Sequence, residues 1–111
     1  MNEITKRKVN PITPDEAEEK KKIDIPDYVI ESVNYLLVKN ISKGQSAFFQ
    51  GDLIEEILKR APEITREDIF KDNMLDFEPL YKDSGWSVQY DKPGYNEDYE
   101  ANFSFRRKLR I

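Results

Sequence analysis

The sequence predicts a small α+β domain, in which a helical body is closed by a C-terminal β-hairpin. Apolar and polar residues alternate over 86–91 and again over 101–106, and the segment between these runs is rich in Pro, Gly, Asn and Asp. This pattern is typical of a hairpin. Upstream of it, apolar residues recur at the three- and four-residue spacing of amphipathic helices. A chain of 111 residues suits one such domain.

The N-terminal residues 1–24 are expected to form a flexible charged arm. They contain two prolines, few bulky apolar side chains and a run of charges, so burial offers little to offset the entropy of ordering. Within the arm, residues 14–22 fit a short exposed helix, because Glu18 and Lys22 lie four positions apart. An arm docked on the domain is the other alternative. The domain itself is expected at 25–106 and a basic tail at 107–111.

A first helix is predicted from about Pro26 to about Asn40, because proline suits the first turn of a helix. A short strand is expected at 46–50, where two aromatic residues follow a glycine turn. Gly51-Asp52 then offers an N-cap for a second helix, which Pro62 ends. Each helix has one apolar stripe: Val29, Ile30, Val33, Leu36 and Leu37 in the first, and Leu53, Ile54, Ile57 and Leu58 in the second.

Two shorter helices are expected before the hairpin. Thr65 and Asp68 resemble the ends of a capping box, with Asp in place of the preferred Glu or Gln. Asp76 is expected to cap the last helix, with Pro79 in its first turn, where a missing N–H breaks no intrahelical bond. Gly85 is a natural left-handed residue at the end of that helix.

The resulting element order, αβααββ, is that of a winged helix-turn-helix, with residues 91–97 in the place of the wing. Other small α+β domains share this order, and the fold does not settle the function. In a winged helix and in other small α+β domains alike, the inward face of the hairpin should be buried against the helices. This face carries Trp86, Val88, Tyr90, Phe103 and Phe105.

The chain contains no Cys and no His. This excludes a zinc site of the usual kind, a thiol nucleophile, a Ser-His-Asp triad and an imidazole base. We therefore expect a protein that is not an enzyme and uses no cofactor. One group of acids near the hairpin has the chemistry to hold Mg²⁺ or Ca²⁺, but its spacing lacks the EF-hand order, so a solvated acidic surface is favoured. These acids are Asp83, Asp91, Glu97, Asp98 and Glu100.

Charge is unevenly distributed along the sequence. The formal net charge is +1 over residues 1–22 and −9 over 23–105, whereas 106–111 carry four basic groups and no acid. An acidic body is unfavourable for binding DNA, because phosphate contacts come from Lys and Arg. The C-terminal end is either a solubilising cationic segment or a local nucleic-acid contact. Its basic residues are Arg106, Arg107, Lys108 and Arg110.

The sequence gives no sign of a membrane protein or a secreted one. No apolar run approaches the roughly 18 residues that a membrane helix needs, and no hydrophobic segment follows the first residues as in a signal peptide. We therefore expect no membrane partner and a cytoplasmic location, with which the absence of cysteine is consistent.

Residues 76–105 resemble the C-terminal half of a family of small uncharacterised tailed-bacteriophage proteins, and 25–34 are similar to the first helix of the same group. The most distinctive part is Gly85-Trp86 followed by the run Tyr90-Asp-Lys-Pro-Gly-Tyr-Asn-Glu97. The likeness covers most of residues 25–105. It implies a phage origin and a host-cytoplasm setting, and it carries over no catalytic residue.

The hairpin loop is the main candidate site. Lys92, Tyr95, Asn96 and Tyr99 are predicted to contact a partner, since tyrosine is favoured at protein interfaces. The structural alternative is a turn set by Pro93-Gly94 and closed by an Asx-type bond of Asn96. The function expected first is a non-enzymatic phage accessory protein that binds a host or phage protein and so modulates host machinery. The alternative is a winged-helix nucleic-acid-binding protein that uses the loop and the basic tail.

Overall fold

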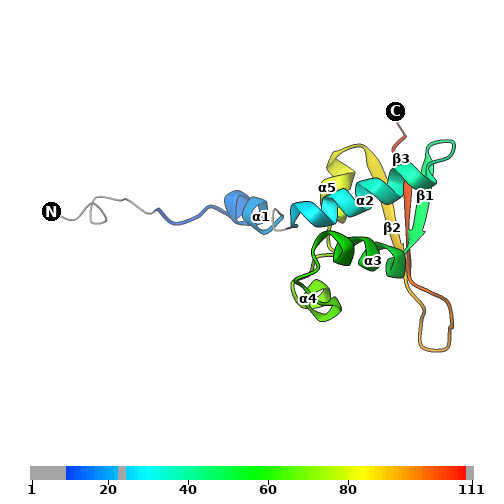
Figure 1. Cartoon of the computed structure of the whole chain (residues 1–111). Coiled ribbons are helices and arrows are strands. Elements are labelled where there is room, and N and C mark those ends of the chain that lie inside the picture. Colours follow the sequence, from blue (N-terminus) through cyan, green and yellow to red (C-terminus); the bar gives the residue numbers. More distant parts are fainter. Residues whose placement is uncertain (1–9, 23–24, 110–111) are drawn as a thin grey trace.

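The structure of the protein is a computed structural model that describes residues 10–22 and 25–109 (Figure 1). The predicted α+β class is confirmed, since helices pack on one antiparallel sheet. Three helices lie between β1 and β2, which matches the second helix and the two shorter helices predicted from the sequence but is one more than the order αβααββ counts. In chain order the elements of the described residues are α1 (Pro14–Lys22), α2 (Asp27–Asn40), β1 (Gln45–Phe49), α3 (Gln50–Arg60), α4 (Arg66–Lys71), α5 (Glu78–Asp83), β2 (Trp86–Asp91) and β3 (Asn102–Arg107).

The sheet has the strand order β1-β3-β2, so the last strand lies in the middle. The register sets Phe103 of β3 between Phe48 of β1 and Tyr90 of β2. Because side chains alternate along a strand, these residues share the face that the helices cover. On the opposite face the middle row is Ala47, Ser104 and Gln89, and all three are exposed.

The core lies between this inner face and helices α2, α3 and α5. Phe105 is its centre, with ring centroids 5.5 Å from Phe48, 6.2 Å from Phe77 and 5.5 Å from Tyr81. The predicted stripes of α2 and α3 are confirmed: Ile30 and Leu58 are half-buried and the other members are buried. Tyr81 of α5 is tied to α2, where its hydroxyl lies 2.6 Å from Asn34 Oδ1.

The hairpin face is less completely buried than expected. Phe103, Phe105 and Val88 are buried, whereas Trp86 is half-buried and Tyr90 is 42% exposed. Tyr90 is the second-last residue of β2, next to the loop that leads to β3, and its ring packs on that of Phe103 with centroids 4.7 Å apart. Its phenol therefore contributes one face to the core and leaves the rest of the ring accessible.

Two predicted helix caps are wrong, and one is confirmed. Strand β1 runs directly into α3, so the N-cap is Phe49, with no side-chain bond, instead of Gly51-Asp52. Helix α5 begins after Phe77 instead of Asp76, although Pro79 does lie in its first turn. In α4 the capping box is complete: Thr65 N donates to Asp68 Oδ2 at 2.9 Å, and Asp68 N donates to Thr65 Oγ1 at 3.2 Å.

Helix α1 occupies residues 14–22, the segment in which the sequence analysis allowed a short exposed helix. Thr13 and Glu16 form reciprocal hydrogen bonds of 3.0 and 3.2 Å at its start, which is the geometry of a capping box. The bond from Thr13 N to the Glu16 carboxylate lowers the pKa of that carboxyl. The remainder of the arm expected at 1–24 lies mostly outside the described residues. Within the described part of the chain, no helix combines the length and the apolar composition needed to cross a membrane.

Candidate functional site

The connection between β2 and β3 extends beyond the sheet as a long loop (Figure 1). Its stem is the last pair of the hairpin, in which Asp91 faces Asn102. We use the name loop end for residues 49–52 and 90–101, which comprise this loop and the β1–α3 junction beside its stem.

Hydrogen bonds inside the loop fix its shape. The Tyr99 hydroxyl lies 2.8 Å from Asp91 Oδ1 and 2.8 Å from the carbonyl oxygen of Lys92, and its single proton is shared between these two acceptors. The bond to the Asp91 carboxylate raises the pKa of Tyr99 to about 12, because it stabilises the protonated phenol. Tyr99 thus bends back over the stem and braces it.

A tight turn lies at the tip of the loop. Gly94 N donates to Glu97 Oε1 at 2.8 Å, and Glu97 N donates to the Gly94 carbonyl at 3.2 Å. A Cβ on Gly94 would lie 2.8 Å from Glu97 Oε1, so a larger residue here would displace that carboxylate from the turn. The Asx-type bond expected of Asn96 is not the one that closes the turn; the longer side chain of Glu97 reaches the amide instead.

A third set of bonds joins the loop to helix α3. Gly51 N donates to Glu100 Oε2 at 3.2 Å, and Gln50 N donates to the Ala101 carbonyl at 2.8 Å. Helix α3 has no side-chain cap of its own, so Glu100 serves as one from 49 residues away. A carboxylate is favourable here because the first turn of a helix carries partial positive charge.

At the tip of this hydrogen-bonded loop, the side chain of Tyr95 is fully exposed. Lys92 and Asn96 are exposed as well. All four residues predicted to contact a partner are therefore exposed on the loop, although the hydroxyl of Tyr99, whose side chain is 39% exposed, also holds the loop in place.

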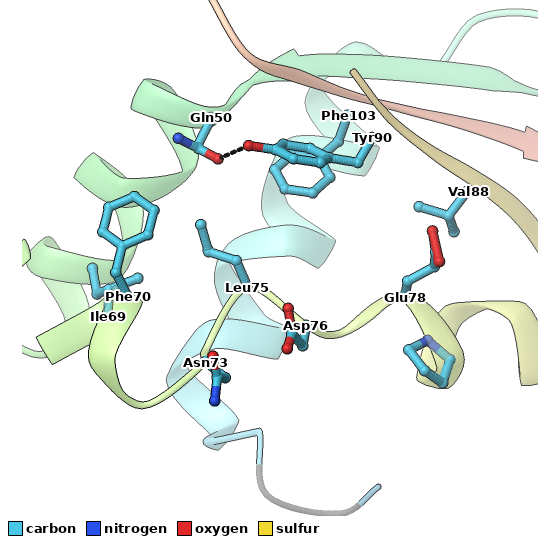
Figure 2. Close-up of a pocket in the computed structure, with 11 residues that line it drawn as sticks. Gln50, Ile69, Phe70, Asn73, Leu75, Asp76, Glu78, Val88, Tyr90 and Phe103 are labelled. Carbon is cyan, nitrogen blue, oxygen red and sulfur yellow. Dashed lines mark hydrogen bonds between the residues drawn. The ribbon is translucent and has the colours of Figure 1, made fainter. Parts of the chain in front are cut away.

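A groove of about 490 Å³ adjoins the base of the loop (Figure 2). Tyr90 and Phe103 form its wall on the sheet, Phe70 and Leu75 face them from α4 and the α4–α5 turn, and a 2.7 Å hydrogen bond from the Tyr90 hydroxyl to Gln50 Oε1 closes one side. The other lining residues are Ile69, Asn73, Asp76, Glu78, Pro79 and Val88. This groove was not predicted from the sequence, in which the available signal was Phe70, a large apolar residue next to Ile69 in the short helix α4.

The acids weighed as a metal site are not gathered into one. Among the residues that the structure describes, no three His, Cys, Asp or Glu side chains are placed to hold a metal ion. Asp91, Glu97 and Glu100 each accept one of the loop bonds above, and Asp83 ends α5 at the far end of β2.

The basic residues near the C-terminus lie at the opposite end of the sheet from the loop. Arg106 and Arg107 end β3, whose six residues span about 17 Å at the usual rise of a strand. Lys108 Nζ donates to the Lys82 carbonyl at 2.6 Å and so adds a hydrogen bond at the end of α5, where Gly85 N also donates to this carbonyl. Arg110 lies outside the described residues. We use the name turn end for residues 41–46, 82–87 and 104–109.

No protein-family model matches this chain, no curated protein matches it in sequence, and no solved structure matches it. The functional argument therefore depends on the geometry described above.

Proposed function

We propose that this chain is a non-enzymatic accessory protein that binds another protein through the loop end and the adjoining groove. The observation that carries the proposal is the fully exposed Tyr95 at the tip of a loop that internal hydrogen bonds hold in shape. A loop with this many internal bonds loses little conformational freedom on binding, which favours affinity. Tyrosine is also among the residues that contribute most to protein interfaces.

The charge of the loop end indicates the chemistry of the partner. It carries five acids and one lysine, a formal net charge of −4. Asp76 and Glu78 add further acid at the groove. A complementary surface is therefore basic, and its potential would steer the encounter with the loop.

The groove supports the same proposal through its shape. It is open to solvent beside the loop stem and is lined mainly by apolar and aromatic side chains, with Phe70 45% and Tyr90 42% exposed. An apolar side chain of the partner can enter it while basic residues face the acids of the loop. The expected partner segment thus combines Lys or Arg with one large apolar residue.

Photocrosslinking tests the proposal directly. We expect the variant Tyr95→p-benzoylphenylalanine, expressed as the full chain in bacteria, to give one defined protein adduct upon irradiation. Val38 is a suitable control position, because it is 76% exposed and lies near the end of α2 that leads into the turn end. A nucleic-acid adduct at position 95, or the same adducts from positions 95 and 38, would contradict the proposal.

The resemblance to tailed-bacteriophage proteins supports a phage origin, and it makes a host or phage protein in the host cytoplasm the expected partner. Modulation of host machinery is one consequence of such binding. The neighbouring genes test the origin: we expect phage or prophage genes beside this one. Neighbours that are all ordinary bacterial genes would count against it.

The winged-helix alternative has weaker support. If the arrangement is read as a winged helix, the segment Asp76–Ser84, which contains α5, takes the place of the recognition helix and carries three acids and one lysine. Phosphates would repel it. The loop and the basic residues that this alternative uses together lie at opposite ends of the sheet, so they would have to contact separate parts of a nucleic acid.

A further inference from the structure

The turn end contrasts with the acidic body. It contains five basic residues and one acid, a formal net charge of +4. Lys108 is engaged at the end of α5, and Lys82 lies 3.4 Å from Glu78. Within the described residues, none of the salt bridges involves Lys43, Arg106 or Arg107. These three side chains are exposed and remain available for a ligand.

Backbone geometry brings these three residues together from distant parts of the sequence. Lys43 and Gly44 form a two-residue turn with φ values of 53° and 77°, and Ser42 and Gln45 exchange hydrogen bonds of 2.8 and 3.0 Å across it. Arg107 N donates to the Gly44 carbonyl at 3.0 Å. Arg106 faces Gln45 in the register of β1 and β3. Lys43 is therefore fixed beside the last two residues of β3.

Two adjoining hollows lie at this end and share Gly44 and Arg107. The larger, of about 480 Å³, is lined by Lys43, Gln45, Arg106 and Leu109 in addition to the shared pair. The smaller, of about 290 Å³, is lined by Ile41, Ser84, Gly85 and Trp86 in addition to them. Trp86 is half-buried, and its ring meets Phe105 edge to face at 5.9 Å. An indole ring of fixed orientation thus lies next to a strongly basic hollow.

We propose that the turn end binds a short segment of single-stranded nucleic acid, in which Lys43, Arg106 and Arg107 contact phosphates and an unpaired base stacks on Trp86. Basic grooves combined with aromatic rings are the usual means of binding single strands. A duplex keeps its bases stacked inside and cannot offer one to the indole. An acidic peptide would use the cations but would leave Trp86 without a stacking partner. The proposal is independent of the protein-binding role of the loop end.

The single tryptophan of the chain provides a direct readout, since Trp86 is the only residue of its kind. We expect twelve-residue oligo(dT) and oligo(rU) to quench the fluorescence of the full chain at low salt. Equal quenching indicates a site that does not distinguish DNA from RNA, and a preference identifies the natural class. For three phosphate contacts on a single strand, log K should fall with log salt with a slope of about −2.

Variants connect the binding to the named residues. The double variant Arg106→Ala/Arg107→Ala should weaken oligonucleotide binding by about tenfold or more, since it removes two of the three phosphate contacts. The matched control is Lys59→Ala/Lys71→Ala, which removes the same charge from exposed positions on α3 and α4 and should change the affinity less than twofold. Circular dichroism confirms that both proteins are folded. Equal affinities for the two variants would overturn the proposal.

Three comparison ligands complete the test. Inorganic polyphosphate and poly-glutamate carry the charge without bases, and a duplex carries the bases without exposing them. The proposal predicts that none of them quenches Trp86 and that each binds at least tenfold more weakly than the single strand. Tighter or equal binding of the duplex, of poly-glutamate or of polyphosphate overturns the proposal in favour of a duplex, an acidic protein or any polyanion, respectively. Absence of binding by all ligands overturns it outright.

Discussion

The loop end and the turn end of the sheet carry opposite formal charges, −4 and +4, although the same three strands connect them. They also use their charges differently. At the loop end, Asp91, Glu97 and Glu100 accept hydrogen bonds from the chain itself. At the turn end, Lys43, Arg106 and Arg107 form no salt bridge with the described residues. The acids therefore shape the loop that presents Tyr95, whereas the cations remain available for a ligand.

The loop end and the turn end are both supported by one hydrophobic core, so the largest loss of stability is expected from a substitution in this core. Phe105 is 1% exposed and contacts the ring of Trp86 at the turn end as well as that of Phe48, which directly precedes the loop-end residues 49–52. Phe105→Ala should lower the free energy of unfolding by about 4 kcal/mol, because it leaves a cavity among aromatic rings. Urea denaturation followed by circular dichroism measures this value. A loss below about 1 kcal/mol would show that the ends are stabilised separately.

A smaller change should affect the loop end alone. Tyr95→Ala is expected to weaken binding of the protein partner by about 1–2 kcal/mol, as for a tyrosine in an interface. The melting temperature should not change, because the side chain is fully exposed. Calorimetry with the crosslinked partner and thermal unfolding measure these two quantities, with Val38→Ala as control. Oligonucleotide binding at the turn end should be unchanged. Loss of folding in Tyr95→Ala would make the loop purely structural.

Two variants of the loop distinguish the hydrogen bond that an acidic side chain forms from the negative charge that it carries. Glu100→Ala removes the acceptor for Gly51 N and should cost about 1 kcal/mol, the usual value of a helix cap. Asp98→Ala removes the same charge from the same loop, where no described residue donates to it, and should cost nearly nothing. Hydrogen exchange at the Gly51 amide should accelerate only in the Glu100 variant. Equal effects of the two variants would reduce the role of Glu100 to its charge.

The smallest effect concerns pH. The folded-state pKa of Tyr99 is raised to about 12 by its bond to Asp91, above the ordinary value of 10.0. This bond therefore contributes fully below pH 10 and is lost as the pH rises through 12. Tyr81 is also raised to about 12, by burial, so ultraviolet titration of Tyr99→Phe should lose only part of the high-pH transition. An unchanged transition near pH 12 would contradict the bond.

Local signals in the sequence determined much of this protein. The stripes of α2 and α3, the Thr65–Asp68 capping box, Pro79 in the first turn of α5 and the hairpin all depend on residues within four positions or on strict alternation. Such patterns are decided by the geometry of one helix turn or one pleat. The exposed position of Tyr95 also followed, since a proline and a glycine place it beyond the strands.

Contacts between distant segments decided the rest. Glu100 caps α3 from 49 residues away, and no spacing along the chain indicates that pair. The groove is lined by residues of the sheet, of α4 and of the α4–α5 turn that are distant in the sequence, and Lys43 lies beside Arg107 only because β3 pairs with β1. The number and sign of the charges follow from the sequence alone. Their separation to opposite ends of the sheet depends on the strand order, because antiparallel pairing places the α2–β1 turn and the β2–β3 loop at opposite ends of the same strands.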